Sequence, residues 1–297
     1  MKINTKHIVI IVSFLFLSSA LSAQINPLGS QFFQNKYLAN AAMAGIDQGL
    51  NVNFGYREQW GAITGTPRST SATTEYRADK VGLGLNFYSD QAGLLNNTIL
   101  KGTFAYHLPV GNDQQEIHFG LSLGLNRLQL NNQDIVAAPN DPAAQNFNER
   151  AAAFDGDFGF AYTNQKLTVE GAFNNIKSQV QKSTQNDVDY NTFYTAISYQ
   201  FELPSWKISP KASYRGVKNY TDIVDLGVEL KTISEDFGAI GIYHTNKSLS
   251  LGVSYQHKKQ WQLMSFYNTA TKPLENYTNG SFEIGLRVNI PNHKAGK

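Results

Sequence analysis

The sequence predicts an antiparallel, up-and-down transmembrane β-barrel, and three observations lead to this fold class. Apolar residues occupy every second position in many segments, as do Val81, Leu83, Leu85 and Phe87, with Gly or Asn between them. This is the period of a strand with one apolar face. Many such segments run about 9 to 12 residues, the length that a tilted strand needs to cross a bilayer. Long and short connections also alternate, as in outer-membrane barrels.

Composition excludes several classes of protein. The 297 residues include no Cys, and only 16% are charged, which rules out a disulfide scaffold and a Cys-ligated metal site. Without Lys2 and Lys6, which belong to the predicted signal peptide, the 25 basic residues become 23 and equal the 23 acidic residues. The mature chain therefore lacks the cationic excess that is typical of proteins that bind nucleic acids.

The N-terminus predicts export. Lys2 and Lys6 precede an apolar run over residues 8–17, and small residues dominate positions 18–23, which is the pattern of a secretory signal peptide. The run is shorter than the ~20 residues of a membrane-spanning helix. We therefore predict a signal peptide at 1–23 and a periplasmic segment at 24–50 that plugs the lumen or contacts a partner.

Strand-like alternation continues almost to the end of the chain. We predict a barrel of about 14 strands over residues 51–290, followed by a tail at 291–297. The expected strands are 51–60, 68–77, 80–90, 97–108, 115–129, 155–163, 166–173, 190–201, 205–215, 221–232, 236–244, 248–257, 260–268 and 281–290. Aromatic residues fall mainly near the expected strand ends, where rings reach the lipid headgroups.

The connections predict the orientation of the barrel in the outer membrane. Counted from a periplasmic N-terminus, the odd-numbered links include 61–67, 90–96, 131–150, 174–189 and 269–280, whereas the even-numbered links are mostly short. Two odd links, near 217–220 and 245–247, are short as well. Because such barrels have short periplasmic turns and longer extracellular loops, we expect the odd links outside and both termini in the periplasm.

The final strand carries a possible assembly signal. Glu283, Gly285, Val288 and Ile290 follow a spacing of polar, Gly, apolar and apolar residues. This spacing is similar to the terminal-strand signal that the barrel assembly machinery reads. The usual aromatic end is absent.

Charged residues on the inward phase predict a polar lumen. Lys207, Lys211 and Arg215 recur every four residues in one strand, and Asp225 and Glu229 lie in the next. A turn centred near residue 218 would place Lys211 opposite Asp225 and Lys207 opposite Glu229, which neutralises their charges. This set is either a structural ladder of ion pairs or a substrate selectivity filter. Other residues expected to face inward are Arg57, Glu75, Arg77, Lys101 and Glu170.

No sequence motif indicates catalysis, a metal or a cofactor. His118 and Ser122 share a strand face, but a spacing of four residues separates them by ~13 Å along the strand, too far for a nucleophile and its base. The acidic triplet Asn140, Asp141 and Pro142 is typical of a turn. We therefore expect a protein that is not an enzyme.

Five ordered blocks resemble the PorP/SprF family of Bacteroidota outer-membrane proteins. They are SQFFQNKYLANAAMAG at 30–45, YREQWGAITGTPRS at 56–69, GLGLNFYSDQAGLLNNT at 82–98, AYHLPVG at 105–111 and FGLSLGLNRLQL at 119–130. The first block keeps the family residues Ser30, Gln31, Asn35, Asn40, Ala44 and Gly45. Lys36 and Ala41 stand where the family usually has proline.

The resemblance implies a role beside the type IX secretion and gliding motility machinery, in exporting or anchoring a large secreted surface protein such as an adhesin. Its implied partners are that secreted protein and other secretion components. We expect contact through the polar loops at 131–154, 174–189 and 269–280, and we take Asn140, Asp141 and Pro142 as candidate contact residues. The alternative is an outer-membrane porin or a channel for hydrophobic solutes.

Overall fold

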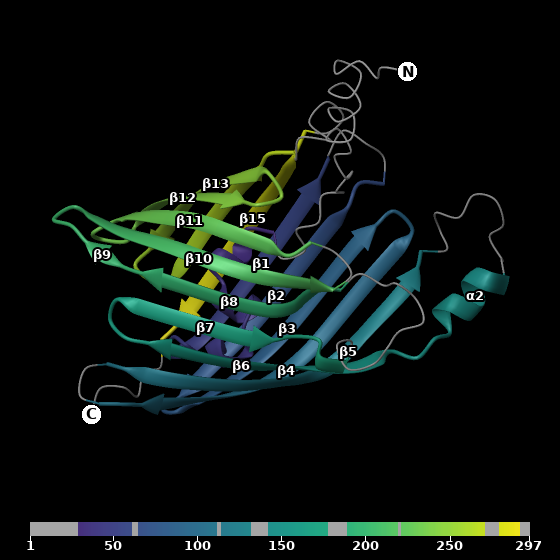
Figure 1. Ribbon diagram of the computed structural model, residues 1–297, viewed down its shortest axis with the longest axis horizontal. Helices are drawn as coiled ribbons and strands as arrows, with labels where there is room; N and C mark the ends of the chain where they lie inside the picture. Colours follow the sequence, from purple (N-terminus) through teal and green to yellow (C-terminus); the bar gives the residue numbers. More distant parts are fainter. Residues whose placement is uncertain are drawn as a thin grey trace, which may run out of the picture.

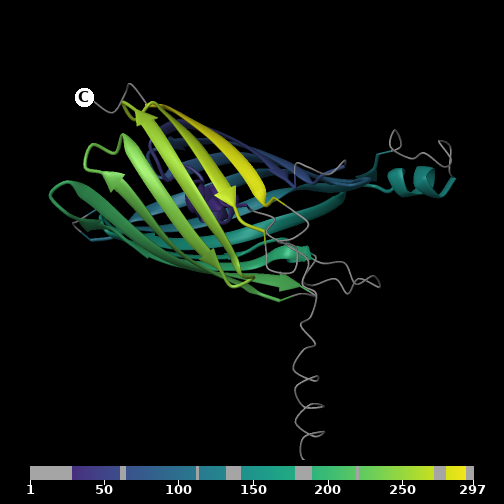
Figure 2. The same ribbon diagram turned by 90° about the horizontal axis from the view of Figure 1, so that it is seen from above.

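The computed structural model describes residues 29–60, 65–111, 114–131, 142–177, 189–218, 221–270 and 279–291. Within them, one antiparallel sheet closes into a barrel, because β10 pairs with β11 at the point where the strand order would otherwise end. Figures 1 and 2 show the strands tilted around a central space. The predicted signal peptide and most of the predicted tail lie outside the described residues.

The strands are β1 (Gly49–Gln59), β2 (Arg68–Ala78), β3 (Val81–Ala92), β4 (Leu95–Pro109), β5 (Glu116–Leu130), β6 (Ala153–Thr163), β7 (Leu167–Phe173), β8 (Asp189–Tyr199), β9 (Phe201–Glu202), β10 (Trp206–Lys218), β11 (Ile223–Thr232), β12 (Phe237–His244), β13 (Ser248–His257), β14 (Trp261–Asn268) and β15 (Ser281–Ile290). β9 is a two-residue strand that pairs only with β10. The predicted barrel of 14 strands is therefore confirmed.

One predicted loop is wrong. The sequence DQAGLLN at 90–96 was expected to form an outer link, but β3 continues to Ala92 and β4 begins at Leu95. Only Gly93 and Leu94 remain between the two strands, and Gly93 has a φ of 57°. Positive φ in a two-residue hairpin turn is what glycine permits without steric strain.

The alternation of residues separates the two faces of the barrel wall. β3 lies between β2 and β4 in the sheet. Its residues Leu83 and Leu85 are each 52% exposed and point outward, whereas Gly82 of the same strand is buried on the inward face. An outward apolar band and a polar interior are typical of transmembrane barrels. None of the helices among the described residues has the length and apolar character to cross a membrane.

The two ends of the barrel differ. The end where β1 begins and β15 stops, here called the turn end, has short links such as 79–80, 164–166 and 258–260. The opposite end, the loop end, has the long links 131–152, 174–188 and 269–280. By the rule for outer-membrane barrels, the turn end faces the periplasm and the loop end faces outward.

Residues 29–47, here called the plug, lie inside the barrel. They form the short 3-10 helices η1 (Gln31–Phe33), η2 (Lys36–Leu38) and η3 (Ala41–Met43), which Figure 2 shows in purple within the ring of strands. The helix α2 (Pro142–Asn148) projects past the end of β5, clear of the ring of strands, in both figures. The Asn148 side chain accepts a hydrogen bond from Leu130 N and donates one to Leu130 O. These two bonds take the place of pairing with a neighbouring strand at the end of β5.

Candidate functional site in the barrel lumen

A wall carboxylate holds the plug near the loop end. The backbone N–H of Ser30 donates to both Glu283 oxygens at 2.9 and 3.1 Å, and Asn268 Nδ2 donates to Glu283 Oε1 at 2.6 Å. Arg57 Nε lies 3.6 Å from the same carboxylate. A buried carboxylate is unfavourable unless it is paired and hydrogen-bonded. The plug therefore supplies part of the environment that Glu283 requires.

Two plug aromatics contact cationic wall residues. Lys211 Nζ lies 5.6 Å from the ring centroid of Phe32 and 5.2 Å from that of Phe33. Arg215 Cζ lies 4.8 Å from the Phe32 centroid. Cations at this distance from aromatic rings are attracted to the ring face. These contacts bind the first turn of the plug to β10.

The wall also binds the other end of the plug. Gly45 N donates to Glu75 Oε2 at 2.9 Å, and His107 Nε2 donates to Ala44 O at 3.1 Å. In the neutral state, His107 Nδ1 must then accept from His118 Nδ1 at 2.7 Å. His118 Nε2 in turn accepts from Thr163 Oγ1 at 2.8 Å. A hydrogen-bonded chain therefore runs from β6 to the plug backbone.

Wall glycines give the plug its space. A Cβ at Gly82 would lie 2.1 Å from Ala44 O, one at Gly120 would lie 2.3 Å from Ala41 O, and one at Gly159 would lie 2.0 Å from Asn40 Oδ1. Such distances are far shorter than van der Waals contact. The small residues between the apolar residues of these strands are therefore explained by close approach of the plug backbone.

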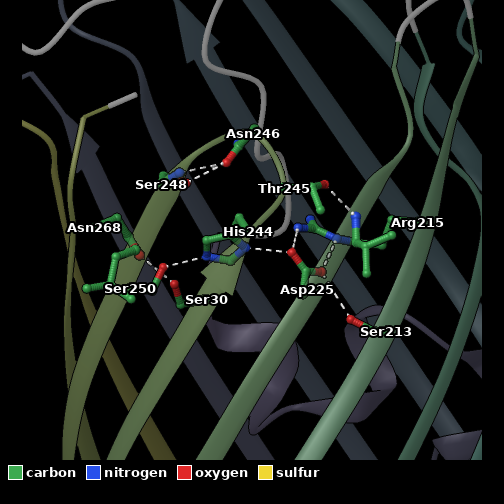
Figure 3. Close-up of polar contacts among 12 residues, drawn as sticks. Ser30, Ser213, Arg215, Asp225, His244, Thr245, Asn246, Ser248, Ser250 and Asn268 are labelled. Atoms are coloured by element: carbon green, nitrogen blue, oxygen red, sulfur yellow. Dashed lines mark hydrogen bonds and ion pairs between the residues drawn. The ribbon is translucent and has the colours of Figure 1, made fainter. Parts of the chain in front are cut away.

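Figure 3 shows a chain of buried polar side chains near the loop end. Arg215 donates to both oxygens of Asp225 at 2.8 Å. His244 Nδ1 lies 2.5 Å from Asp225 Oδ1, and its Nε2 lies 2.7 Å from Ser250 Oγ. Asp, His and Ser in this order form the triad of many hydrolases. Here Asp225 is 1% exposed, and His244 and Ser250 are 0% exposed, so the arrangement fits a structural network.

The structure corrects the predicted register between β10 and β11. Ser213 stands opposite Asp225, which centres the hairpin at residue 219 rather than 218. A shift of one residue in the turn centre moves every cross-strand partner by two residues. Lys211 therefore stands opposite Gly227, and Lys207 opposite Lys231.

The predicted ladder residues consequently have other partners. Arg215 contacts Asp225, and Lys211 Nζ lies 3.7 Å from Glu170 Oε1 on β7. Lys207 pairs with Glu235 in the turn between β11 and β12. Glu229 pairs with Lys231 at 3.0 Å and accepts a hydrogen bond from Gln34 of the plug.

The remaining inward charges are paired across neighbouring parts of the wall. Lys101 Nζ lies 2.6 Å from Asp157 Oδ1, and Arg77 lies 2.6 Å from Glu116 Oε1. Glu170 is 1% exposed beside Lys211. No group of three or more His, Cys, Asp or Glu side chains suited to a metal ion occurs in the described part of the chain.

Among the described residues predicted as the assembly signal or as partner contacts, Glu283 belongs to the buried polar contacts of the lumen. The others lie elsewhere. Gly285 is buried on the inward face, whereas Val288 is partly exposed and Ile290 is 53% exposed on the outward face. Pro142 is exposed at the start of α2. Asn140 and Asp141 lie outside the described residues.

A polar vestibule of about 350 Å³ lies between the plug and the turn end. Its lining includes Lys36 and Ile46 of the plug, Lys166 of the link between β6 and β7, Lys231 of β11 and Arg287 of β15. Arg287 forms an ion pair with Asp47, which lies at the end of the plug. The vestibule is therefore lined by charged side chains from both the plug and the wall.

The family residues in the first block are wall contacts. Asn35 Nδ2 donates to Thr73 Oγ1 at 2.9 Å, and Asn40 Nδ2 donates to Phe160 O at 3.2 Å. Gln31 Nε2 donates to Ile284 O at 3.1 Å. Sequence reasoning missed the His107–His118 pair, although both residues fall on the predicted inward phase of neighbouring strands. The alternation of residues was a usable signal for this pair.

Comparisons with solved structures support the same fold. The chain resembles the CymD monoaromatic hydrocarbon channel with a TM-score of 0.51 and 12% identity, over 92% of this chain and 96% of that one. It resembles the toluene transporter TbuX of Ralstonia pickettii with a TM-score of 0.52 and 12% identity, over 91% and 96% of the two chains. No curated protein matches the sequence.

The family comparison covers nearly the whole chain. Residues 21–288 match the family described as type IX secretion system membrane protein PorP/SprF. The match includes the plug and almost all of the barrel, and it extends well beyond the N-terminal blocks that carry the resemblance in the sequence. The barrel and this match together place the protein in the outer membrane, and the chain belongs to the PorP/SprF family of type IX secretion system membrane proteins.

Proposed function

We propose that this protein is a plugged barrel that helps to export or anchor a large secreted surface protein during type IX secretion. The observation that carries the proposal is the fixed plug. Wall side chains bind the plug backbone at Ser30 and Gly45, near its two ends. A barrel closed in this way is suited to hold a partner at its surface rather than to conduct solutes.

A porin or hydrophobic-solute channel is the alternative, because CymD and TbuX are described as a hydrocarbon channel and a toluene transporter. A path for an apolar solute requires an apolar lining. The inward residues near the plug here include buried Lys101, Glu170 and Arg215. The charged lumen favours the accessory role.

Catalysis has no place in the proposal. The triad-like order of Asp225, His244 and Ser250 requires a substrate to reach Ser250 Oγ, which is fully buried. Asp225 is also shared by Arg215 and Ser213. A network of this kind stabilises the wall, and we assign the protein no enzymatic role.

Native extraction from outer membranes in mild detergent, followed by mass spectrometry, tests the proposed function. We expect a large secreted surface protein or other secretion components in near-stoichiometric amounts. A variant with residues 142–150 replaced by a Gly-Ser linker should lose the secreted protein. The same replacement at residues 110–115, a link at the turn end, is the matched control and should retain it. Recovery of the barrel alone after crosslinking, together with measurable conductance, would favour the channel.

A further inference from the structure

The vestibule between the plug and the turn end carries an excess of positive charge. Its described lining includes the cations Lys36, Lys166, Lys211, Lys231 and Arg287, and the anions Asp47, Glu75 and Glu229. Five cations against three anions leave an excess of two positive charges. A cleft with an excess of one charge sign and low-dielectric walls concentrates ions of the opposite sign. The vestibule should therefore attract anions.

The three carboxylates of the lining already have partners. Asp47 forms an ion pair with Arg287, and Glu229 lies 3.0 Å from Lys231 Nζ. Glu75 accepts a backbone N–H of the plug at 2.9 Å. Among the described residues, the other three cations of the lining therefore have no counter-charge within the vestibule.

Two of these three cations lie on the plug and on the turn end of the wall. Lys36 belongs to η2 and is half-buried, whereas Lys166 belongs to the link between β6 and β7 and is exposed. Neither ammonium group forms an ion pair with a residue that the structure describes. An ammonium group is a compact point charge with three donors, so each can bind an anion without breaking an existing pair.

The third cation, Lys211 of β10, is buried in the lining. It is only 5% exposed, and its Nζ makes no hydrogen bond to any described residue. Its ion pair with Glu170 has a separation of 3.7 Å, which is longer than a hydrogen bond. A buried donor without an acceptor is costly. An oxygen atom brought into the vestibule would therefore be stabilised by Lys211.

The size and polarity of the vestibule suit a small organic anion. Its volume of about 350 Å³ lies within the range of ligand sites, which is roughly 300–1,000 Å³. The amides of Asn164 and Gln200 in the lining can both donate and accept hydrogen bonds. A singly charged carboxylate fits better than a phosphate, because the three lining carboxylates repel a doubly charged group more strongly. Arg287, the cation best shaped for phosphate, is already paired.

We propose that the vestibule is a periplasm-facing binding site for carboxylates, with Lys211 as the deepest contact and Lys36 and Lys166 as the outer ones. The ligand would enter through the turn end, where Lys166 of the lining is exposed. A diffusible dicarboxylate and an acidic side chain of a periplasmic protein share this chemistry. The inference does not rest on the proposed function, which concerns a partner at the opposite end of the barrel.

Calorimetric titration of the purified full-length protein in detergent tests the site with two probes. The first is glutarate, and the second is a tetraglutamate peptide with blocked ends. We expect binding that weakens as salt is added, and no binding of the matching tetraglutamine peptide. Tighter binding of glutarate indicates a diffusible ligand, and tighter binding of the peptide indicates a protein segment. Binding of neither probe, or tighter binding of inorganic phosphate, would overturn the proposal.

Substitutions of the lysines locate the binding. Lys211→Met removes the ammonium group and keeps a long side chain, and we expect it to weaken binding about tenfold. Lys36→Gln should also weaken binding, and it leaves the buried pair of Lys211 and Glu170 intact. Lys80→Gln is the matched control, because it removes one charge from an exposed turn-end link outside the lining. Heat-modifiable migration on gels checks folding. Wild-type affinity in folded Lys36→Gln and Lys211→Met would refute the site.

Chemical acetylation of lysines, followed by mass spectrometry, provides a readout on the unaltered protein. Glutarate should slow the acetylation of Lys36 and Lys166 and leave that of Lys80 unchanged. Equal protection of all three would indicate general charge screening and contradict the proposal. Residues 292–297 read NHKAGK, a segment with two lysines and no acidic side chain, so its charge does not suit the vestibule. Binding that appears only after these residues are removed would show that the chain covers its own site, and would also overturn the proposal.

Discussion

The carboxylate of Glu283 accepts the backbone N–H of Ser30 through both of its oxygens, at 2.9 and 3.1 Å. The two residues are 253 positions apart in the chain. The last strand of the barrel is therefore bound directly to the first turn of the plug. Closure of the barrel and placement of the plug are coupled, because each provides hydrogen-bond partners that the other needs.

Replacing Glu283 tests this coupling. Glu283→Gln removes the charge that faces Arg57 and leaves one acceptor oxygen for Ser30 N. We expect a loss of about 1.5–3 kcal/mol in the free energy of unfolding, measured in urea with lipid vesicles. Glu58→Gln is the control, because the exposed pair of Glu58 with Arg68 contributes at most about 1 kcal/mol. Equal losses in both variants would contradict the assigned role of Glu283.

A side chain at Gly120 should displace the plug. Gly120→Val places atoms where Ala41 and Ala42 of the plug lie, whereas Gly102→Val on the neighbouring strand meets nothing within 4 Å. We expect Gly120→Val to increase single-channel conductance in planar bilayers and Gly102→Val to leave it unchanged. A silent Gly120→Val barrel that is correctly folded would show that the plug adapts instead of moving.

Ser250 should be chemically inert. Because its hydroxyl is fully buried against His244, we expect no labelling of the folded protein by a fluorophosphonate probe. Ser250→Ala should lower the free energy of unfolding by about 0.5–1.5 kcal/mol, the contribution of one hydrogen bond. Asp225→Asn should cost about 3–5 kcal/mol, because it leaves buried Arg215 without its counter-charge. Labelling of Ser250 in the native protein would contradict the structural assignment.

Proline should be accepted at Ala41, the first residue of η3. The preceding Asn40 has an extended conformation, with φ of −145° and ψ of 115°, which is compatible with a following proline. We expect Ala41→Pro to change the free energy of unfolding by less than about 1 kcal/mol. Ala42→Pro is the matched control. It removes the N–H that bonds to Asn40 Oδ1 and should cost about 1 kcal/mol or more. The reverse order of the two losses would refute this placement of η3.

Glu235, in the turn between β11 and β12, should make stability depend on pH. Burial raises the pKa of its carboxyl, but the hydrogen bond from Lys207 and the charges of Lys207 and Lys259 outweigh burial and hold the pKa below its ordinary value. A lowered pKa stabilises the fold at neutral pH, and this contribution is lost as the pH falls through the lowered value. Melting temperatures of the wild type and Glu235→Gln should therefore differ at pH 7 and converge in acid. A constant difference would contradict this linkage.

The sequence alone determined the class of fold and the two faces of the wall. A side-chain period of two separates outward from inward residues whatever the neighbouring strand is, so Leu83 and Glu75 were assigned to faces without knowledge of any contact. Strand length and the alternation of long and short links then predicted a transmembrane barrel. These properties are local, and the sequence is sufficient for them.

Only the tertiary structure decided which inward residues meet. The partner of Asp225 depends on the centre of one turn. A shift of one residue put Ser213 opposite Asp225 in place of Lys211, and Arg215, two residues further along β10, pairs with the carboxylate. The bond between Ser30 and Glu283 arises from closure of the whole barrel. Because such contacts join residues far apart in the chain, they depend on the summed registers of many strand pairs, which no local pattern specifies.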